Sequence, residues 1–256
     1  MTVYTYLTSR AASAVLSEAE KSSIATSIAT LRTRLNSYFG EDLSAHFSFG
    51  SQTRGTILPR NMDPESDVDY MTVFSDDGYT PQTYLNKLKS FAEYYYYSSE
   101  IYQSSPTLVL ELNHIKFELV PALNADSGYY IPDGGGGWML TTPNTFNKKL
   151  TDENQACASL LKPAIRLVKF CNAEKGYPFS SYPMERSIVD FNFWGNSVLA
   201  DYVFDIFDQL ALPTGSAEGK RDRLNRAREI VANTRYYLKE SMPVSAESEV
   251  KKLIPE

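Results

Sequence analysis

From residue 66 to residue 74 the chain reads SDVDYMTVF, with two aspartates two positions apart. Polar and apolar residues alternate from Asp67 to Phe74, which predicts a strand. Residues i and i+2 of a strand project to the same face, so the Asp67 and Asp69 carboxylates would lie side by side. Like charges at that spacing repel, whereas Mg²⁺ prefers carboxylate and phosphate oxygens. The pair therefore predicts a magnesium site, with a solvated strand end as the alternative that a lone pair leaves open.

The residues upstream of this strand indicate a phosphate-binding turn. A short strand over 46–49 is predicted to end at Gly50-Ser51, and Arg54-Gly55-Thr56 follows at once. Glycine lets backbone N–H groups approach a phosphate, and the serine hydroxyl adds a donor. A simple turn is the alternative for Gly50-Ser51 alone. Residues 52–66 are rich in Gly, Pro, Asn, Asp and Ser, which predicts a loop.

A third acid, Glu118, lies among apolar residues typical of a strand, in the stretch KFELVP over 116–121. A carboxylate at such a position is expected if this strand lies beside Asp67 and Asp69. Glu111, on the strand before it, is the competing candidate. An exposed strand residue is the alternative for Glu118, and Lys116 could be a simple cross-strand partner.

The rest of the chain predicts a helix, then a mixed α/β block, then a helical block, without internal repeats. Ser17 and Glu20 form a capping box before a predicted helix over 18–39. The other predicted elements are a helix over 80–97, strands over 107–112 and 115–121 with a turn at Asn113-His114, an irregular stretch over 124–145 with a mobile loop at Gly134–Gly137, and helices over 151–174 (interrupted at Pro163), 182–211 and 216–239, with a weakly patterned tail after Pro243.

Composition narrows the classes of function. A chain of 256 residues with a net charge of −6 is not suited to binding long nucleic acid. The only cysteines, Cys157 and Cys171, are too few for a zinc ribbon, and we interpret them as reduced thiols of a cytosolic protein. Residues 1–16 lack the layout of a signal peptide, and no apolar run could span a membrane. We therefore expect a cytoplasmic protein.

Four segments together resemble the polymerase-β nucleotidyltransferase superfamily, which carries a Gly-Ser pair, a D-x-D or D-x-E strand and a third acid on a later strand. They are Phe49-Gly50-Ser51, Arg54-Gly55-Thr56, Ser66-Asp67-Val68-Asp69 and Phe117-Glu118-Leu119-Val120-Pro121. Residues 130–144, 164–170 and 181–185 further resemble the oligoadenylate-synthase-like or cyclic GMP-AMP-synthase-like nucleotidyltransferases (CD-NTases) of bacteria, over about residues 20–210 in all.

This resemblance implies an α+β fold: a polymerase-β-type core, with a mixed sheet and flanking helices, over 1–148, and a helical domain over 149–256 that closes a nucleotide cleft. It implies that Asp67, Asp69 and Glu118 are catalytic and hold two Mg²⁺ ions, with Mn²⁺ as an alternative. It implies that Lys169 reaches the donor triphosphate and that Tyr182 stacks on the donor base. The full set of nucleotide-binding residues that it implies is Gly50, Ser51, Gln52, Arg54, Thr56, Lys169, Ser181 and Tyr182.

The implied activity is synthesis of cyclic di- or oligonucleotide second messengers from nucleoside triphosphates (ATP, with GTP, UTP or CTP as further substrates) in anti-phage signalling. One alternative is a nucleotidyltransferase that modifies RNA, tRNA or protein, and the cations between Lys220 and Arg228 would suit an RNA unless they form a solvated helix face. Another alternative is a non-catalytic nucleotide-sensing module. The chain departs from the family pattern in having Glu rather than Asp at 118, and no zinc-binding insert is visible.

Overall fold

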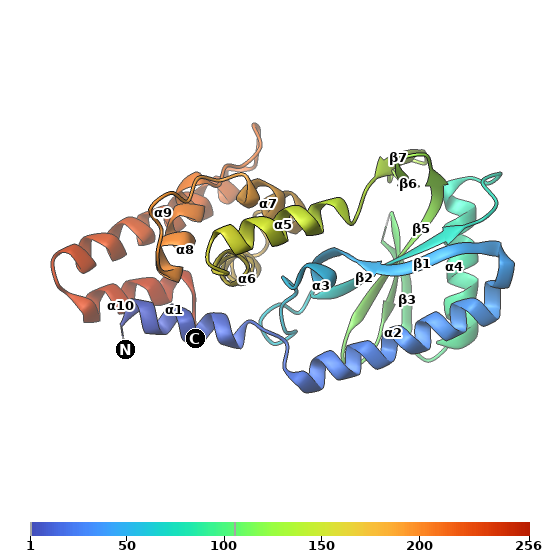
Figure 1. The fold of residues 1–256 in the computed structure, drawn as a ribbon, viewed down its shortest axis with the longest axis horizontal. Helices are drawn as coiled ribbons and strands as arrows, with labels where there is room; N and C mark the ends of the chain where they lie inside the picture. Colours follow the sequence, from blue (N-terminus) through green and yellow to red (C-terminus); the bar gives the residue numbers. More distant parts are fainter. Residues whose placement is uncertain (1, 105) are drawn as a thin grey trace. The chain divides into compact units, whose positions relative to one another are not determined.

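A computed structural model describes residues 2–104 and 106–256 of the chain. The chain divides into two compact units, which are described separately below (Figure 1). The sheet unit comprises Leu16–Arg60 and Pro64–Lys148, and the helical unit comprises Met1–Val15, Asn61–Asp63 and Lys149–Glu256. One division between the units lies at residues 148 and 149, and the first residues, up to Val15, group with the C-terminal helices.

The sheet unit is built on a mixed sheet, as predicted for an α+β fold. The order of its main strands is β1-β2-β5-β4-β3, and β6 and β7 extend it from β5. Strands β2 and β5 run parallel, while the other neighbouring pairs run antiparallel. The strands are β1 (Leu43–Phe49), β2 (Asp67–Phe74), β3 (Glu100–Ser104), β4 (Thr107–Glu111), β5 (Lys116–Ala125), β6 (Gly128–Pro132) and β7 (Trp138–Thr141).

Two helices, α2 (Glu18–Phe39) and α4 (Pro81–Tyr95), pack on one face of this sheet (Figure 1). The predicted capping box begins α2: the Ser17 hydroxyl accepts from Glu20 N at 3.2 Å, and Ser17 N donates to Glu20 Oε2 at 2.7 Å. Apolar residues at helical spacing on both helices meet alternate residues of the strands. The resulting core includes Leu31, Leu35, Val68, Tyr70, Tyr84, Leu88, Phe91, Phe117 and Leu119.

The irregular stretch expected over 124–145 is wrong, because much of it forms the β6–β7 hairpin. The glycine run at 134–137 closes this hairpin. Asp133 organises the turn, since its Oδ1 accepts from Gly135 N at 2.7 Å and from Gly137 N at 2.9 Å. Glycines occupy this turn because Gly134 and Gly136 adopt φ values of 80° and 98°, which side chains disfavour. Strand β3 was also missed, being short and mostly exposed.

The helical unit contains more breaks than its sequence pattern predicted. Its helices are α1 (Val3–Ser13), α5 (Thr145–Ala156), α6 (Leu161–Glu174), α7 (Ser181–Val189), α8 (Leu199–Gln209), α9 (Glu218–Lys239) and α10 (Pro243–Leu253). The helix expected over 151–174 is interrupted, but at Ala158 and Ser159, which adopt φ values of 50° and 63°, and not at Pro163. Pro163 is the third residue of α6, where a missing backbone N–H breaks no intrahelical bond.

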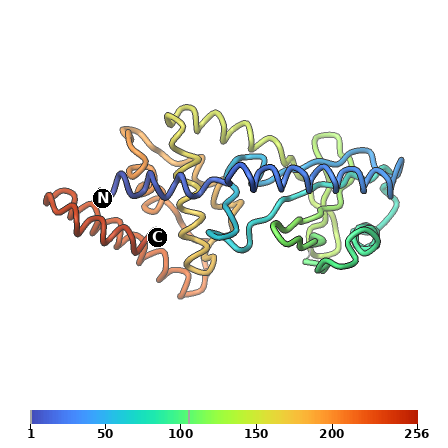
Figure 2. Tube along the Cα trace, turned by 90° about the horizontal axis from the view of Figure 1, so that it is seen from below, coloured from blue at the N-terminus to red at the C-terminus, as the bar shows by residue number. Residues whose placement is uncertain are grey.

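Two further corrections concern the last hundred residues. The single helix expected over 182–211 is two helices, α7 and α8, separated by a loop that contains Phe191 and Phe193. The tail after Pro243 is not weakly ordered but forms α10, which lies beside α9 (Figure 2). Within the described residues, no helix is both long and apolar enough to cross a membrane.

Candidate active site

The pairing of β2 with β5 places acidic side chains next to one another across two strands. Asp69 is the register partner of Glu118, and Asp67 is the register partner of Lys116. Residues in register on parallel neighbours project to the same face, and such strands lie about 4.8 Å apart. Asp67, Asp69 and Glu118 therefore share one face of the sheet within two adjacent strands.

This acidic face lies opposite the helix-covered face. Val68 and Tyr70, which alternate with the aspartates, are 0% and 1% exposed in the main core. Asp67, Asp69 and Glu118 are half-buried. Further along the acidic face, Met71, Val73 and Ala122 form a small apolar cluster of their own. The acids thus lie at one end of the acidic face, and the small apolar cluster lies further along the same strands.

Gly50 fits closely against the Asp69 carboxylate. It follows β1 directly and is the first residue of a short helix, α3 (Gly50–Arg54), where a strand end and loop had been expected. A Cβ at Gly50 would lie 1.7 Å from Asp69 Oδ2 and 2.6 Å from its Cγ, and the residue adopts a φ of 73°. No side chain larger than hydrogen fits there, so this glycine is required by the neighbouring acid as well as by its backbone.

The other residues expected to contact nucleotide around α3 differ in accessibility. Ser51 and Gln52 are half-buried, and the Ser51 carbonyl accepts from Thr56 N at 3.0 Å and from Ile57 N at 3.2 Å. Arg54 and Thr56 are 5% and 0% exposed. The guanidinium carbon of Arg54 lies 5.5 Å from the centre of the Phe146 ring. Arg54 and Thr56 are thus less accessible to a nucleotide than Ser51 and Gln52 are.

Glu118 and Lys116 each have a partner that sequence patterns did not reveal. The Thr107 hydroxyl, on β4, lies 3.4 Å from Glu118 Oε2. The Lys116 ammonium, 8% exposed, pairs with Glu65 Oε2 at 2.9 Å. Burial acts to lower the pKa of Lys116, but its hydrogen bond with Glu65 and the negative charges of Asp67 and Glu118 outweigh burial, so the pKa is raised. A fixed positive charge therefore lies beside the acids.

Glu111, the competing third acid, is engaged elsewhere. Its Oε1 accepts from Arg60 Nη1 at 2.6 Å. Although Glu111 is the register partner of Lys116, it lies one strand further from β2 than Glu118 does. The structure thus favours Glu118 over Glu111 as the neighbour of the aspartate pair.

Asp67, Asp69 and Glu118 suit a magnesium ion that takes its remaining ligands from substrate phosphates and water. In the described part of the chain, no group of three or more His, Cys, Asp or Glu side chains is placed so that it could hold a metal ion. Magnesium, however, is usually bound by one or two carboxylates together with substrate phosphates and water. Asp67 and Asp69 on one strand, with Glu118 beside Asp69, supply oxygen ligands of that kind.

The remaining predicted nucleotide contacts lie in the helical unit. Lys169, on α6, is nearly buried, and its Nζ lies 3.3 Å from Oε1 of Glu185, which is 0% exposed on α7. Ser181 and Tyr182 begin α7; both are exposed, with Tyr182 at 44%. Glu185 belongs to the stretch 181–185 that carried the resemblance, but it was not among the predicted nucleotide contacts.

Comparison with solved structures shows the same fold. The cyclic AMP-GMP synthase DncV of Vibrio cholerae, in complex with nonhydrolyzable GTP, matches with a TM-score of 0.78 at 13% identity, covering 99% of this chain and 95% of DncV. CdnC of E. coli MS115-1 with ATP gives 0.74 at 12% identity, covering 99% and 98%. CdnG of Bradyrhizobium diazoefficiens, a CD-NTase in complex with GTP, gives 0.71 at 12%, covering 96% and 97%.

Sequence comparison gives the family. A probable cyclic nucleotide synthase of Bacillus cereus (strain VD146) is 28% identical over an alignment of 194 residues, and the match covers 60% of this chain and 56% of that relative. The chain thus matches little more than half the length of this relative. Residues 1–154 match the SMODS domain, whose full description is Second Messenger Oligonucleotide or Dinucleotide Synthetase domain. Because that match covers more than half of the chain, the resemblance predicted from the motifs is confirmed, and the chain belongs to the SMODS family.

Proposed function

We propose that this protein is a magnesium-dependent nucleotidyltransferase that joins nucleoside triphosphates into cyclic di- or oligonucleotide second messengers. The observation that supports this most strongly is the pairing of Asp69 with Glu118 across β2 and β5, with Asp67 on the same face. The glycine that packs on the Asp69 carboxylate adds a second, independent constraint at the same point. Membership of the SMODS family supports the reaction class.

In the proposed reaction a ribose hydroxyl attacks the α-phosphorus of a nucleoside triphosphate. A new oxygen–phosphorus bond forms, the bond to the β-phosphate oxygen breaks, and pyrophosphate leaves. Asp67, Asp69 and Glu118 would hold Mg²⁺, which when bound neutralises phosphate charge and makes the hydroxyl more acidic. Glu118 orients the attacking hydroxyl and favours its deprotonation. Backbone N–H groups at Gly50 and Ser51 bind the terminal phosphates, so the protein mainly positions the reactants.

Substitution of the acids tests this reaction directly. Asp67→Asn and Asp69→Asn keep the size of each side chain and remove its charge. Loss of either ligand is expected to lower product formation by about 10³-fold or more, several kcal/mol of transition-state stabilisation. The assay is mass spectrometry of products from all four ribonucleoside triphosphates with Mg²⁺. Glu100→Gln, an exposed acid on the edge strand β3, is the matched control. Undiminished product from both aspartate variants would refute the proposal.

The same assay separates synthesis of messengers from modification of RNA. The cations of α9 that could have suited an RNA are largely engaged within the protein. Arg228 donates to the backbone carbonyls of Phe207 and Leu210 at 3.1 and 2.6 Å, and Arg226 pairs with Glu229. We therefore favour products that form without any added nucleic acid. A reaction that requires RNA would instead support a nucleotidyltransferase that modifies RNA. Nucleotide binding without turnover would support the non-catalytic nucleotide-sensing module.

We further propose that these products serve in bacterial anti-phage signalling, as the family resemblance implies. Cells that express the chain would then resist phage only when its three acids are intact. Phage plating with wild-type and Asp67→Asn proteins, expressed at equal levels, tests this role. Equal protection by both proteins would disprove it.

A further inference from the structure

The helical unit contains an ion pair that is almost entirely removed from water. Lys169 Nζ on α6 lies 3.3 Å from Glu185 Oε1 on α7, and the side chains are 8% and 0% exposed. The other buried lysine pair, between Lys116 and Glu65, differs, because its Glu65 side chain is 66% exposed. The Lys169–Glu185 pair is thus a pair in which both charges have been desolvated.

Stability alone is a poor explanation for such a pair. Desolvating two charges offsets most of their attraction, and apolar residues of similar volume often stabilise a core as well or better. Apolar residues are buried close to each charge along the two helices, namely Leu167, Val168, Met184 and Ile188. Retaining the charges is better explained by a need for the ammonium in a defined place.

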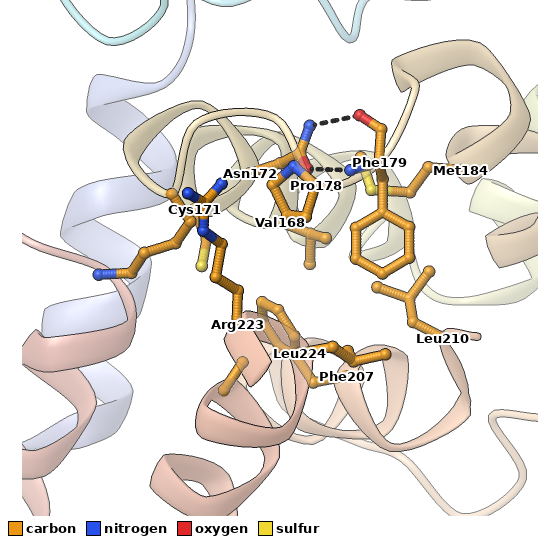
Figure 3. Close-up of a pocket in the computed structure, with 12 residues that line it drawn as sticks. Val168, Cys171, Asn172, Pro178, Phe179, Met184, Phe207, Leu210, Arg223 and Leu224 are labelled. Carbon is orange, nitrogen blue, oxygen red and sulfur yellow. Dashed lines mark hydrogen bonds between the residues drawn. The ribbon is translucent and has the colours of Figure 1, made fainter. Parts of the chain in front are cut away.

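A second contact fixes the start of α7 against the same side of α6. Asn172, three residues after Lys169, is buried and clamps the segment before α7: its Nδ2 donates to Phe179 O, and its Oδ1 accepts from Phe179 N, both at 3.0 Å (Figure 3). Residues three apart on a helix share a side. The neighbouring cavity is lined mostly by apolar residues, together with Lys175 and Arg223, and burial raises the pKa of its Cys171 thiol to about 12, so that thiol adds no charge.

The position of Glu185 on α7 links it to the predicted nucleotide contacts. Ser181 and Tyr182 precede it by four and three residues, so they lie on the same side of the helix. Helical side chains lean toward the N-terminus and cover the preceding turn. The Glu185 carboxylate therefore lies under the turn that carries Ser181 and Tyr182, and it holds the Lys169 ammonium there.

We propose that Glu185 is a positioning residue that fixes the Lys169 ammonium beneath the first turn of α7 for recognition of nucleoside triphosphate. This inference rests on the proposed function, from which the phosphate contact of Lys169 is taken. An ammonium carries three donors, so it can contact a carboxylate and a phosphate oxygen together. Glu185 then contributes to the affinity for the phosphates of a nucleotide and not to the affinity for its base.

Nucleotide titrations of the full chain test this assignment. Binding of ATP, AMP and adenosine is measured by calorimetry with Ca²⁺ in place of Mg²⁺ to suppress turnover. Glu185→Gln is expected to weaken ATP binding about tenfold or more, the scale of a hydrogen bond to a charged group, and to leave adenosine binding within about twofold. Lys169→Met should show the same selective loss, and the double variant should lose little more than either single variant.

The matched control is Glu249→Gln, which removes a nearly buried glutamate of the same unit whose Lys252 partner is half-exposed. It should leave the ratio of ATP to adenosine affinity unchanged. Equal losses for ATP and adenosine in Glu185→Gln would show that the pair is structural and overturn the proposal. If Glu185→Gln does not fold, Glu185→Asp decides: wild-type ATP affinity in that folded variant would equally overturn it.

These outcomes separate this inference from the proposed function. If the wild-type chain makes no product but its ATP selectivity depends on Glu185, the synthase proposal fails and the positioning role stands. If the wild type makes product while Glu185→Gln keeps its ATP selectivity, only the positioning role fails. A chain that binds no nucleotide at all would disprove both.

Discussion

The two faces of the sheet use alternate residues of the same strands for different purposes. On β2, Val68 and Tyr70 enter the core under α2 and α4, while Asp67 and Asp69 project from the opposite face. On β5, Phe117 and Leu119 enter that core, while Glu118 joins the aspartates. Packing on the helix-covered face stabilises the strands, and the same strands hold like charges close together on the acidic face. The acidic face can therefore tolerate repulsion between its carboxylates, because burial of apolar residues on the helix-covered face stabilises the sheet.

Among the variants that compare the two faces, the largest effect is expected from crowding the acidic face at Gly50. Gly50→Ala would place a Cβ on the Asp69 carboxylate, and Gly55→Ala is the matched control because its φ of 71° is similar but no atom lies within 4 Å. Both variants should lose about 1–2 kcal/mol from the left-handed backbone. Only Gly50→Ala should also lower product formation about 100-fold or more, through displacement of Asp69. Equal activity of the two variants would contradict this close fit.

A smaller effect is expected from the helix-covered face, between the two aspartates. Val68→Ala removes two buried methyl groups and should lower the free energy of unfolding by about 2 kcal/mol. Asp67, Asp69 and Glu118 stay on the acidic face in this variant, so its turnover per folded molecule should stay near that of the wild type. Chemical denaturation and product assays below the melting range measure the two quantities. A fall in turnover as large as that of Gly50→Ala would show that the faces are not independent.

Thr107 offers a still smaller perturbation of the acidic face. Its hydroxyl lies 3.4 Å from Glu118 Oε2 and 2.9 Å from the Ser104 carbonyl. Thr107→Val keeps the shape and removes the hydroxyl, and we expect a loss of about 1 kcal/mol in transition-state stabilisation, roughly fivefold in rate. Thr107→Ser should restore most of the rate. Full activity of the valine variant would mean that Glu118 is oriented without this contact.

The smallest expected effect is a dependence of stability on pH, through His46 on the helix-covered face. Its Nδ1 and Nε2 lie 2.8 Å from the Tyr70 hydroxyl and from Asn36 Oδ1. Burial, and then the charge of Arg32, lower the pKa of His46 from 6.5. The unfolded chain therefore binds the proton more readily, so stability is full above the ordinary pKa and declines as the pH falls through it towards the folded value.

Melting curves of wild type and His46→Gln, recorded from about pH 8 to about pH 5, check this sign. Other titrating groups are shared by the two proteins, so their difference isolates the histidine. Burial raises the pKa of Tyr70 to about 12, so its hydroxyl stays a donor throughout that range. If the wild type loses no more stability than the variant on acidification, folding does not lower the pKa of His46 and the prediction is wrong.

Local signals explain which parts of this fold could be predicted. The capping box at Ser17 and the alternation along Asp67–Phe74 gave the correct bounds for α2 and β2, because both patterns are contained within one element. By contrast, α1 and α10 were missed. Their buried residues, such as Leu7 and Leu253, pack on helices that are distant in the chain, so the sequence pattern within each helix does not reveal that they are buried.

The candidate site shows the same division between local and distant information. Asp67, Asp69, Gly50 and Glu118 were identified from residue type and order. The register that sets Asp69 beside Glu118, and the threonine beside Glu118, depend on pairing between strands far apart in the chain. The burial of Lys169 against Glu185 is likewise invisible locally, because a lysine on a helix is exposed by default.

The parallel pairing of β2 with β5 also has a consequence during synthesis of the chain. These two neighbours are joined by α4, β3 and β4, so β5 emerges from the ribosome long after β2. A nascent or truncated polypeptide that ends before Lys116 carries the Asp67–Asp69 pair but lacks Glu118. Under the proposed function, activity should therefore appear only after Glu118 has been synthesised, and copies that end before Lys116 should form no product.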